Sequence, residues 1–333
     1  MTLNLDITPS TIYMLIGFTV SMYSCVFNDV IQTLGTFLSV NKDKPVWMIW
    51  LFSTLVLAVT LIVGWIVNDG DMAFGRLDRI PFPETFYLWQ VVPPIILVFL
   101  TKFGIPVSTT FLILSVFSSS AVVGMILTKS LFGYVIAFIT SFILYVIIAR
   151  PIERIFLLKK MVHVKAWTIA KWCATAFLWS SWIMQDAANL FVYLPRKATL
   201  EQLILVILGF SFFLWLVAYR RGGEIQNILK IKTNTQDMRS ATIIDLVYTS
   251  ILLYFQTLNN VPMSTTWVFI GLLAGREMAM YHRLRFESPK KMYKHVIKDL
   301  TKTIIGLFVS IVIVQLLVNF DMIKSTVLHF FSL

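Results

Sequence analysis

Two aspartates interrupt apolar stretches of the sequence, and amide side chains lie beside each of them. The two elements read Asn28-Asp29-Val-Ile-Gln32 and Gln185-Asp186-Ala-Ala-Asn189. A carboxylate inside a membrane costs at least about 2.5–3.5 kcal/mol, so it is retained where it faces a cation, a partner or a cavity. We therefore interpret one group as cation-coupling residues, with both aspartates as ligands of Na+ or acceptors of a proton: Asn28, Asp29, Asp186 and Asn189.

A proline followed by three hydroxyl side chains comes after each aspartate, as Pro106-Val-Ser108-Thr109-Thr110 and Pro262-Met-Ser264-Thr265-Thr266. Ser108 follows Asp29 by 79 positions, and Ser264 follows Asp186 by 78. Proline suits the first turn of a helix, whose unpaired N–H groups and partial positive charge attract anions. The pattern predicts a site for a tetrahedral oxyanion, made of neutral donors: Ser108, Thr109, Thr110, Ser264, Thr265, Thr266, Gln32 and Gln185.

The composition indicates that a membrane surrounds these residues. Hydrophobic residues make up 58% of the 333 residues and charged residues 14%, and the mean hydropathy is +0.80. Typical globular chains have roughly 45–50% and 25%. The apolar runs are continuous and long enough to cross a bilayer as helices, which favours an all-α polytopic membrane protein and excludes a β-barrel with alternating strands.

The positive charges predict the topology. The net charge is +11, but most Lys and Arg residues fall in three stretches, Arg150–Lys165, Arg220–Arg239 and Arg276–Lys302. The positive-inside rule assigns these stretches to the cytoplasm, so we expect no nucleic-acid partner. The expected apolar segments are Thr11–Phe27, Trp47–Val67, Phe86–Leu100 paired with Ile105–Leu127, Leu131–Ala149, Trp167–Trp182, Leu203–Ala218, Ala241–Leu258 paired with Val261–Gly275, and Thr303–Phe320.

With this orientation, the two halves of the chain contain the same order of elements in opposite directions, which is an inverted-topology repeat. Each half contains one close pair of segments, joined near Gly104 and near Asn260, that we interpret as a re-entrant helical hairpin. The predicted organisation is a first repeat over 1–150, a cytoplasmic basic linker over 151–166, a second repeat over 167–320 and a short tail over 321–333.

The paired motifs resemble those of the inorganic phosphate transporter (PiT) family, and the resemblance covers both halves of the chain. That family has a duplicated signature similar to Gly-x-Asn-Asp-Val-Ala-Asn-Ala and Gly-x-Pro-Val-Ser-Thr-Thr-His. The resemblance implies Na+- or H+-coupled phosphate uptake, with Asp29 and Asp186 as the signature aspartates and the Ser-Thr-Thr hydroxyls holding phosphate. The departures are Gln32 and Gln185 in place of Asn, Val26 and Ile183 in place of Gly, and Phe111 and Trp267 in place of His.

The sequence thus predicts a secondary active transporter in the cell (inner) membrane that carries inorganic phosphate with Na+ or H+ by alternating access. Sulfate or another tetrahedral oxyanion is an alternative substrate, and an anion-sensing protein that does not transport is an alternative function. No enzyme activity or resident cofactor is expected. The expected partners are the oxyanion, the coupling ion, the lipid bilayer and a second copy in a homodimer. Asp245 is either a third cation ligand or a favourable acid near the start of its helix.

Overall fold

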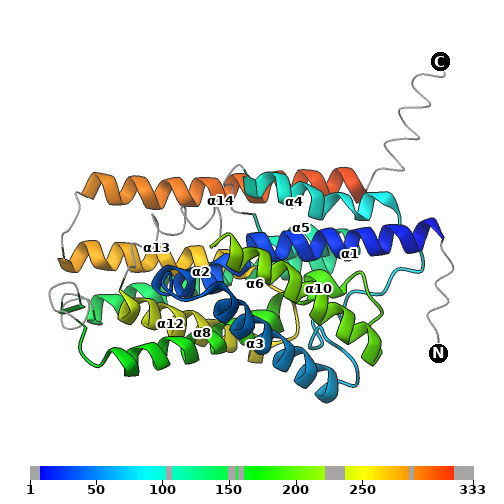
Figure 1. Ribbon diagram of the computed structural model, residues 1–333. Helices are drawn as coiled ribbons and strands as arrows, with labels where there is room; N and C mark the ends of the chain where they lie inside the picture. Colours follow the sequence, from blue (N-terminus) through cyan, green and yellow to red (C-terminus); the bar gives the residue numbers. More distant parts are fainter. Residues whose placement is uncertain are drawn as a thin grey trace.

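The computed structural model describes residues 8–102, 107–148, 155–156, 161–221, 237–284 and 289–318. Within these ranges the chain forms helices and connecting segments and no strand. Figure 1 shows the helices running mostly along one common direction. Their bounds are α1 Pro9–Asn28, α2 Val30–Val40, α3 Val46–Val67, η1 Leu88–Gln90, α4 Val92–Lys102, α5 Thr109–Leu114, η2 Ser115–Phe117, α6 Ser120–Ile148, α8 Val164–Asp186, α9 Ala188–Phe191, α10 Leu200–Tyr219, α12 Met238–Leu258, α13 Thr265–Leu284 and α14 Pro289–Val318.

Six helical segments of the described residues are long and apolar enough to cross a membrane: α1, α3, α6, α10, α12 and residues Val296–Leu317 of α14. Large apolar side chains remain exposed on several of them, such as Leu55 on α3 at 54% and Phe308 on α14 at 65%. Lipid tails are the natural surroundings for such side chains, because hydrocarbon does not disfavour apolar surface. The chain is therefore a multi-pass integral membrane protein.

Several boundaries differ from the expected segments. The structure has α6 continuous from Ser120 to Ile148, where the sequence suggested a break at Thr128–Ser130. These three polar residues do not end the helix. The Ser130 hydroxyl donates to the Ile126 carbonyl of the same helix, and Lys129 Nζ donates to three oxygen atoms of the segment Asn259–Val261. The expected segment Ile105–Leu127 is instead divided at Ser118, whose extended backbone separates η2 from α6. Half of the basic linker, most of the second basic stretch and the whole tail lie outside the described residues.

Both predicted cation-coupling motifs lie at interruptions between helices. Asp29 separates α1 from α2, and its amide still donates to the Cys25 carbonyl. Asp186 is the last residue of α8, and Ala187 separates it from the short helix α9. Discontinuous helices leave backbone groups and helix ends available inside a membrane protein, which is where transporters commonly place their sites.

A close approach between α6 and α13 depends on glycine. A Cβ atom added to Gly271 would lie 2.4 Å from the Tyr134 carbonyl oxygen, and one added to Gly275 would lie 2.2 Å from that of Phe138. These two glycines are four residues apart on α13, the spacing of the small-xxx-small pattern that allows two membrane helices to touch. Helix α6 belongs to the first half of the chain and α13 to the second, so this contact joins the halves.

The two close pairs of segments extend in different directions. Figure 1 shows α4 toward one end of the long direction of the molecule, whereas α12 and α13 extend toward the other. Helix α12 has 21 residues, which is enough to span a bilayer, and α4 has only 11. Since their depth depends on where the bilayer lies, the assignment of both pairs as re-entrant hairpins stays a prediction.

Candidate functional site

The two Ser-Thr-Thr elements meet at one carboxylate. The Thr110 hydroxyl, at the start of α5, donates to Asp186 Oδ1 at 2.9 Å. The Thr265 hydroxyl, at the start of α13, donates to Asp186 Oδ2. Asp186 is 1% exposed. Residues that are more than 150 positions apart therefore converge on a single buried group, as the matched spacing in the sequence predicts.

The second carboxylate has a matching environment. Gln32 Nε2 donates to Asp29 Oδ1 at 3.3 Å and to the Thr266 hydroxyl at 3.0 Å, and that hydroxyl lies 3.5 Å from Asp29 Oδ1. Around the other aspartate, Asn189 Nδ2 donates to Asp186 Oδ1 and to the Thr110 hydroxyl, both at 3.2 Å. Each aspartate is thus joined to the amide three residues later and to the last threonine of the opposite half.

We call these two groups the matched triads: Asp29, Gln32 and Thr266 in one, and Asp186, Asn189 and Thr110 in the other. Thr265 and Thr266 are consecutive and reach one aspartate each, so the triads lie side by side. Asn28 adds a further link, because its Nδ2 donates to Asp29 Oδ1 at 2.7 Å and to the Thr109 hydroxyl at 3.0 Å.

Several acceptor oxygens in and beside the triads have no hydrogen-bond partner among the described residues. They are Asp29 Oδ2, Gln32 Oε1, Asn189 Oδ1 and Gln185 Oε1. Burying such an atom without a partner costs about 1–3 kcal/mol, and more when it is charged. Buried oxygens that lack donors are the expected ligands of a hard cation, which prefers carboxylate and carbonyl oxygen.

Ser108 and Ser264 hold the first turns of their helices. The Ser108 hydroxyl oxygen accepts from the amide of Phe111 at 3.0 Å, and that of Ser264 accepts from the amide of Trp267 at 3.3 Å. Serine is a preferred residue at this capping position. Each oxygen is used as an acceptor there, so the hydroxyl hydrogen remains available to a ligand. Pro106 lies outside the described residues. Pro262 lies three residues before α13 begins at Thr265, so it is not in the first turn of the helix, where the sequence analysis expected it.

Gln185 is placed differently from the other amides that the sequence singled out. Its Nε2 donates to the Leu252 carbonyl on α12 at 3.2 Å, and no described bond joins it to either aspartate. Its counterpart before the first aspartate, Asn28, contacts both Asp29 and Thr109. The longer side chain in the second half therefore contacts the neighbouring helix instead of the matched triads.

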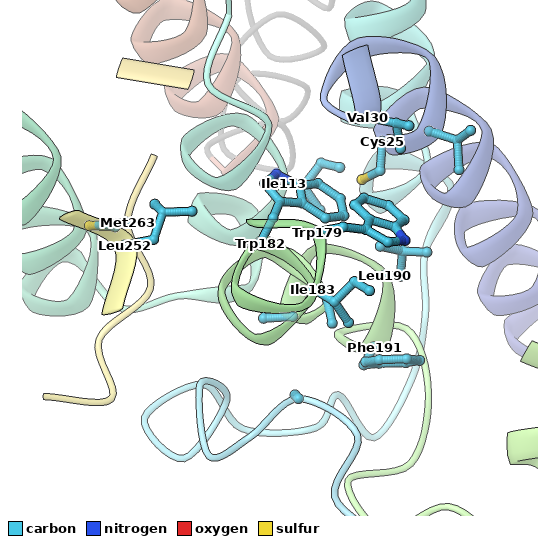
Figure 2. Close-up of a cluster of buried hydrophobic side chains, with 14 of the residues drawn as sticks. Cys25, Val30, Ile113, Trp179, Trp182, Ile183, Leu190, Phe191, Leu252 and Met263 are labelled. Carbon is cyan, nitrogen blue, oxygen red and sulfur yellow. The ribbon is translucent and has the colours of Figure 1, made fainter. Parts of the chain in front are cut away.

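A buried apolar group lies on the helices that carry the triads. Trp179 and Trp182 stack with ring centroids 5.0 Å apart, and Figure 2 shows the two indoles within a buried group that includes Cys25, Ile113 and Leu190. All five side chains are fully buried. A low-dielectric wall of this kind strengthens every charge–charge interaction inside it.

Two buried cations that the sequence analysis did not single out lie near the site. Arg76 Nη1 donates to the Asn259 carbonyl at 2.7 Å, and Lys129 Nζ donates to the same oxygen at 3.1 Å. Burial lowers the pKa of Arg76 to about 10, while the nearby Asp186 carboxylate acts to raise it, so Arg76 keeps its charge at neutral pH. Lys129 could have been recognised from the sequence, because a single lysine between two apolar runs indicates a buried charge with a partner.

Asp245 has a partner that the sequence analysis also missed. Its Oδ2 accepts from Lys171 Nζ at 2.6 Å, and both side chains are at most 1% exposed. The Thr36 and Thr175 hydroxyls donate to the same carboxylate. Asp245 is thus the acidic half of a buried ion pair that joins α2, α8 and α12. The lone Lys171 within an apolar stretch was the available signal.

The comparisons with known proteins support the same architecture. No family model and no curated protein sequence matches the chain. A solved structure described as "The sodium-dependent phosphate transporter" is similar, with a TM-score of 0.64 and 14% sequence identity over 95% of this chain and 98% of that chain. The described residues of this membrane protein therefore have the fold of that phosphate transporter.

Proposed function

We propose that the protein is a secondary active transporter of the cell membrane, which moves inorganic phosphate together with Na+ by alternating access. The observation that carries the proposal is the pair of matched triads, in which each carboxylate is bonded to a threonine from the opposite half. The similarity in fold to a sodium-dependent phosphate transporter supports the choice of substrate and coupling ion.

The hydrogen bonds in the triads suggest how the cation and the anion are coupled. The hydroxyls of Thr110, Thr265 and Thr266 donate toward the two aspartates. An oxyanion at the helix starts would need the same hydroxyl hydrogens, and it would also be repelled by the carboxylates. A cation that binds the carboxylate oxygens removes the repulsion and allows the hydroxyls to turn toward the anion. Each ligand therefore favours the other, as symport requires.

The positions for the two ligands follow from this chemistry. The cation would contact oxygen atoms without donors, such as Asp29 Oδ2 and Asn189 Oδ1. The anion would face the starts of α5 and α13, where threonine hydroxyls and the unpaired amides of the first turns are donors. Each Na+ that moves down the membrane potential supplies about 2.3 kcal/mol per 100 mV, which can drive accumulation of the anion.

Uptake into proteoliposomes tests the proposal. Radiolabelled phosphate is offered to vesicles containing the wild type, Asp186→Asn or Thr110→Val, with an inward Na+ gradient. We expect the wild type to accumulate phosphate and both variants to lose at least about 90% of the rate, since each removes one member of a triad. Ser250→Ala is the matched control, because Ser250 is exposed on α12 and bonds only to the Leu246 carbonyl among the described residues.

The alternatives give different results in the same vesicles. Normal uptake by both triad variants would refute the mechanism. Equal uptake with a proton gradient and no Na+ would identify H+ as the coupling ion, and stronger competition by sulfate than by unlabelled phosphate would identify another oxyanion as the substrate. Binding of phosphate without accumulation would support an anion-sensing protein and refute transport.

A further inference from the structure

Two positive side chains converge on the segment that leads into α13. Arg76 comes from the connection between α3 and η1, and Lys129 comes from α6. Both reach the Asn259 carbonyl, and Lys129 Nζ also donates to Asn259 Oδ1 at 2.9 Å and to the Val261 carbonyl at 2.7 Å. Arg76 is 2% exposed and Lys129 is 8% exposed. The segment Asn259–Val261 precedes Ser264 by only a few residues, so both charges lie near the proposed anion site.

Neither cation forms an ion pair among the residues that the structure describes, although other basic side chains do, for example Lys171 with Asp245. The end of α12 offsets part of their charge, because a helix C-terminus carries about half an elementary negative charge. The unit charge of Arg76 alone exceeds that amount. The Asp186 carboxylate also acts on Arg76, and the proposed cation would neutralise that carboxylate.

Arg76 is the cation closer to the matched triads. Its Nε also approaches the Met184 carbonyl oxygen at 3.5 Å, two residues before Asp186. The guanidinium therefore lies between the end of α8, which carries the carboxylate, and the end of α12, which leads to Thr265. Lys129 uses all three of its N–H groups on backbone and side-chain oxygens of the segment Asn259–Val261, so it positions that segment.

We infer that Arg76 is a specificity-determining residue, whose buried positive charge makes the anion site prefer a doubly charged oxyanion over a singly charged one. The inference rests on the proposed function and adds a charged element to a site that the sequence suggested was made of neutral donors alone. A dianion beside Arg76 gains twice the Coulomb energy of a monoanion, and the surrounding low dielectric keeps that difference large.

The test is the dependence of phosphate uptake on pH. Between about pH 6 and about pH 8 a phosphate group gains its second negative charge. In the wild type we expect KM for total phosphate to fall across this range. In Arg76→Gln, which retains an amide donor for the Asn259 carbonyl but carries no charge, we expect KM at the higher pH to rise at least about tenfold, a loss of about 1.4 kcal/mol. We also expect the fall of KM with pH to disappear.

Two further variants separate charge from structure. Arg79→Gln is the matched control, because Arg79 is exposed in the same connection and should leave KM and its pH dependence unchanged. Arg76→Lys keeps the charge, and we expect KM within about threefold of the wild type with the pH dependence retained. If Arg76→Gln does not fold, as judged by its melting temperature, a loss of the pH dependence in Arg76→Lys would still refute the inference.

An Arg76→Gln protein with the wild-type KM and pH dependence would overturn the inference, since Arg76 would then only bond to the end of α12. Loss of the pH dependence in Arg76→Lys would also overturn it, because the charge would be present without the selectivity. A wild type that takes up no phosphate at all would refute the proposed function, which is a separate result.

Discussion

The buried ion pair between Lys171 and Asp245 should be essential for stability. Replacing Lys171 with Met keeps much of the side-chain volume and removes the charge, which leaves the Asp245 carboxylate buried without its cation. Breaking a buried pair in this way costs about 3–5 kcal/mol. Two hydroxyls still donate to the carboxylate, from Thr36 at 2.8 Å and from Thr175 at 2.7 Å. We therefore expect the lower end of the range, about 3 kcal/mol.

Thermal unfolding in detergent, followed by intrinsic tryptophan fluorescence, measures this effect. A loss of about 3 kcal/mol corresponds to a fall in melting temperature of about 4 °C for a chain of this size. The double variant Lys171→Met/Asp245→Asn removes both charges, so it should recover at least about half of the loss. Lys165→Met is the matched control, because Lys165 is exposed on the same helix and should leave the melting temperature unchanged.

The reasoning would be refuted if Lys171→Met melted within about 1 °C of the wild type, or if the double variant were less stable than the single one. In the first case the pair contributes no net stability. In the second case Asp245 has a stabilising role that does not depend on Lys171.

Two more predictions concern packing and pH. Gly275→Leu should lower stability by more than about 1–3 kcal/mol, because its Cβ would collide with the Phe138 carbonyl, whereas Gly124→Leu has open space around its Cβ and should be neutral in the same thermal assay. Burial acts to raise the pKa of Asp237, but hydrogen bonds from Arg239 outweigh it and lower the pKa overall. The stability that Asp237 contributes should therefore be complete above about pH 3.9 and should disappear as the pH falls further. Asp237→Asn should accordingly have a lower melting temperature than the wild type only at the higher pH. A difference in melting temperature that does not depend on pH would contradict this.

The convergence of the site was predictable because the chain repeats its chemistry. The spacing from Asp29 to Ser108 nearly equals that from Asp186 to Ser264, and the structure brings both hydroxyl elements to these carboxylates. The hydrogen-bond partner of each hydroxyl was not predictable from the sequence. The threonines donate toward the aspartates, and the serines cap their helices, because side-chain geometry at a helix start decides between these bonds.

The buried cations could not be assigned from the sequence because their partners are distant in the chain. Lys171 reaches Asp245 on α12, and Lys129 reaches Asn259 beyond the end of that helix. A lysine within an apolar run signals a buried partner, but the identity of the partner depends on which helices pack together. The same lack of tertiary information led to the expected break at Lys129, where the structure has one continuous helix.

The glycine contact between α6 and α13 limits which parts of the molecule can move. Gly271 and Gly275 of α13 lie directly against the backbone of Tyr134 and Phe138 on α6. If α13 slid along α6, larger side chains would have to replace these glycines at the contact, and there is no space for them. The two helices should travel as a single rigid unit. Any hinge that opens the site to one side of the membrane should therefore lie outside this pair of helices.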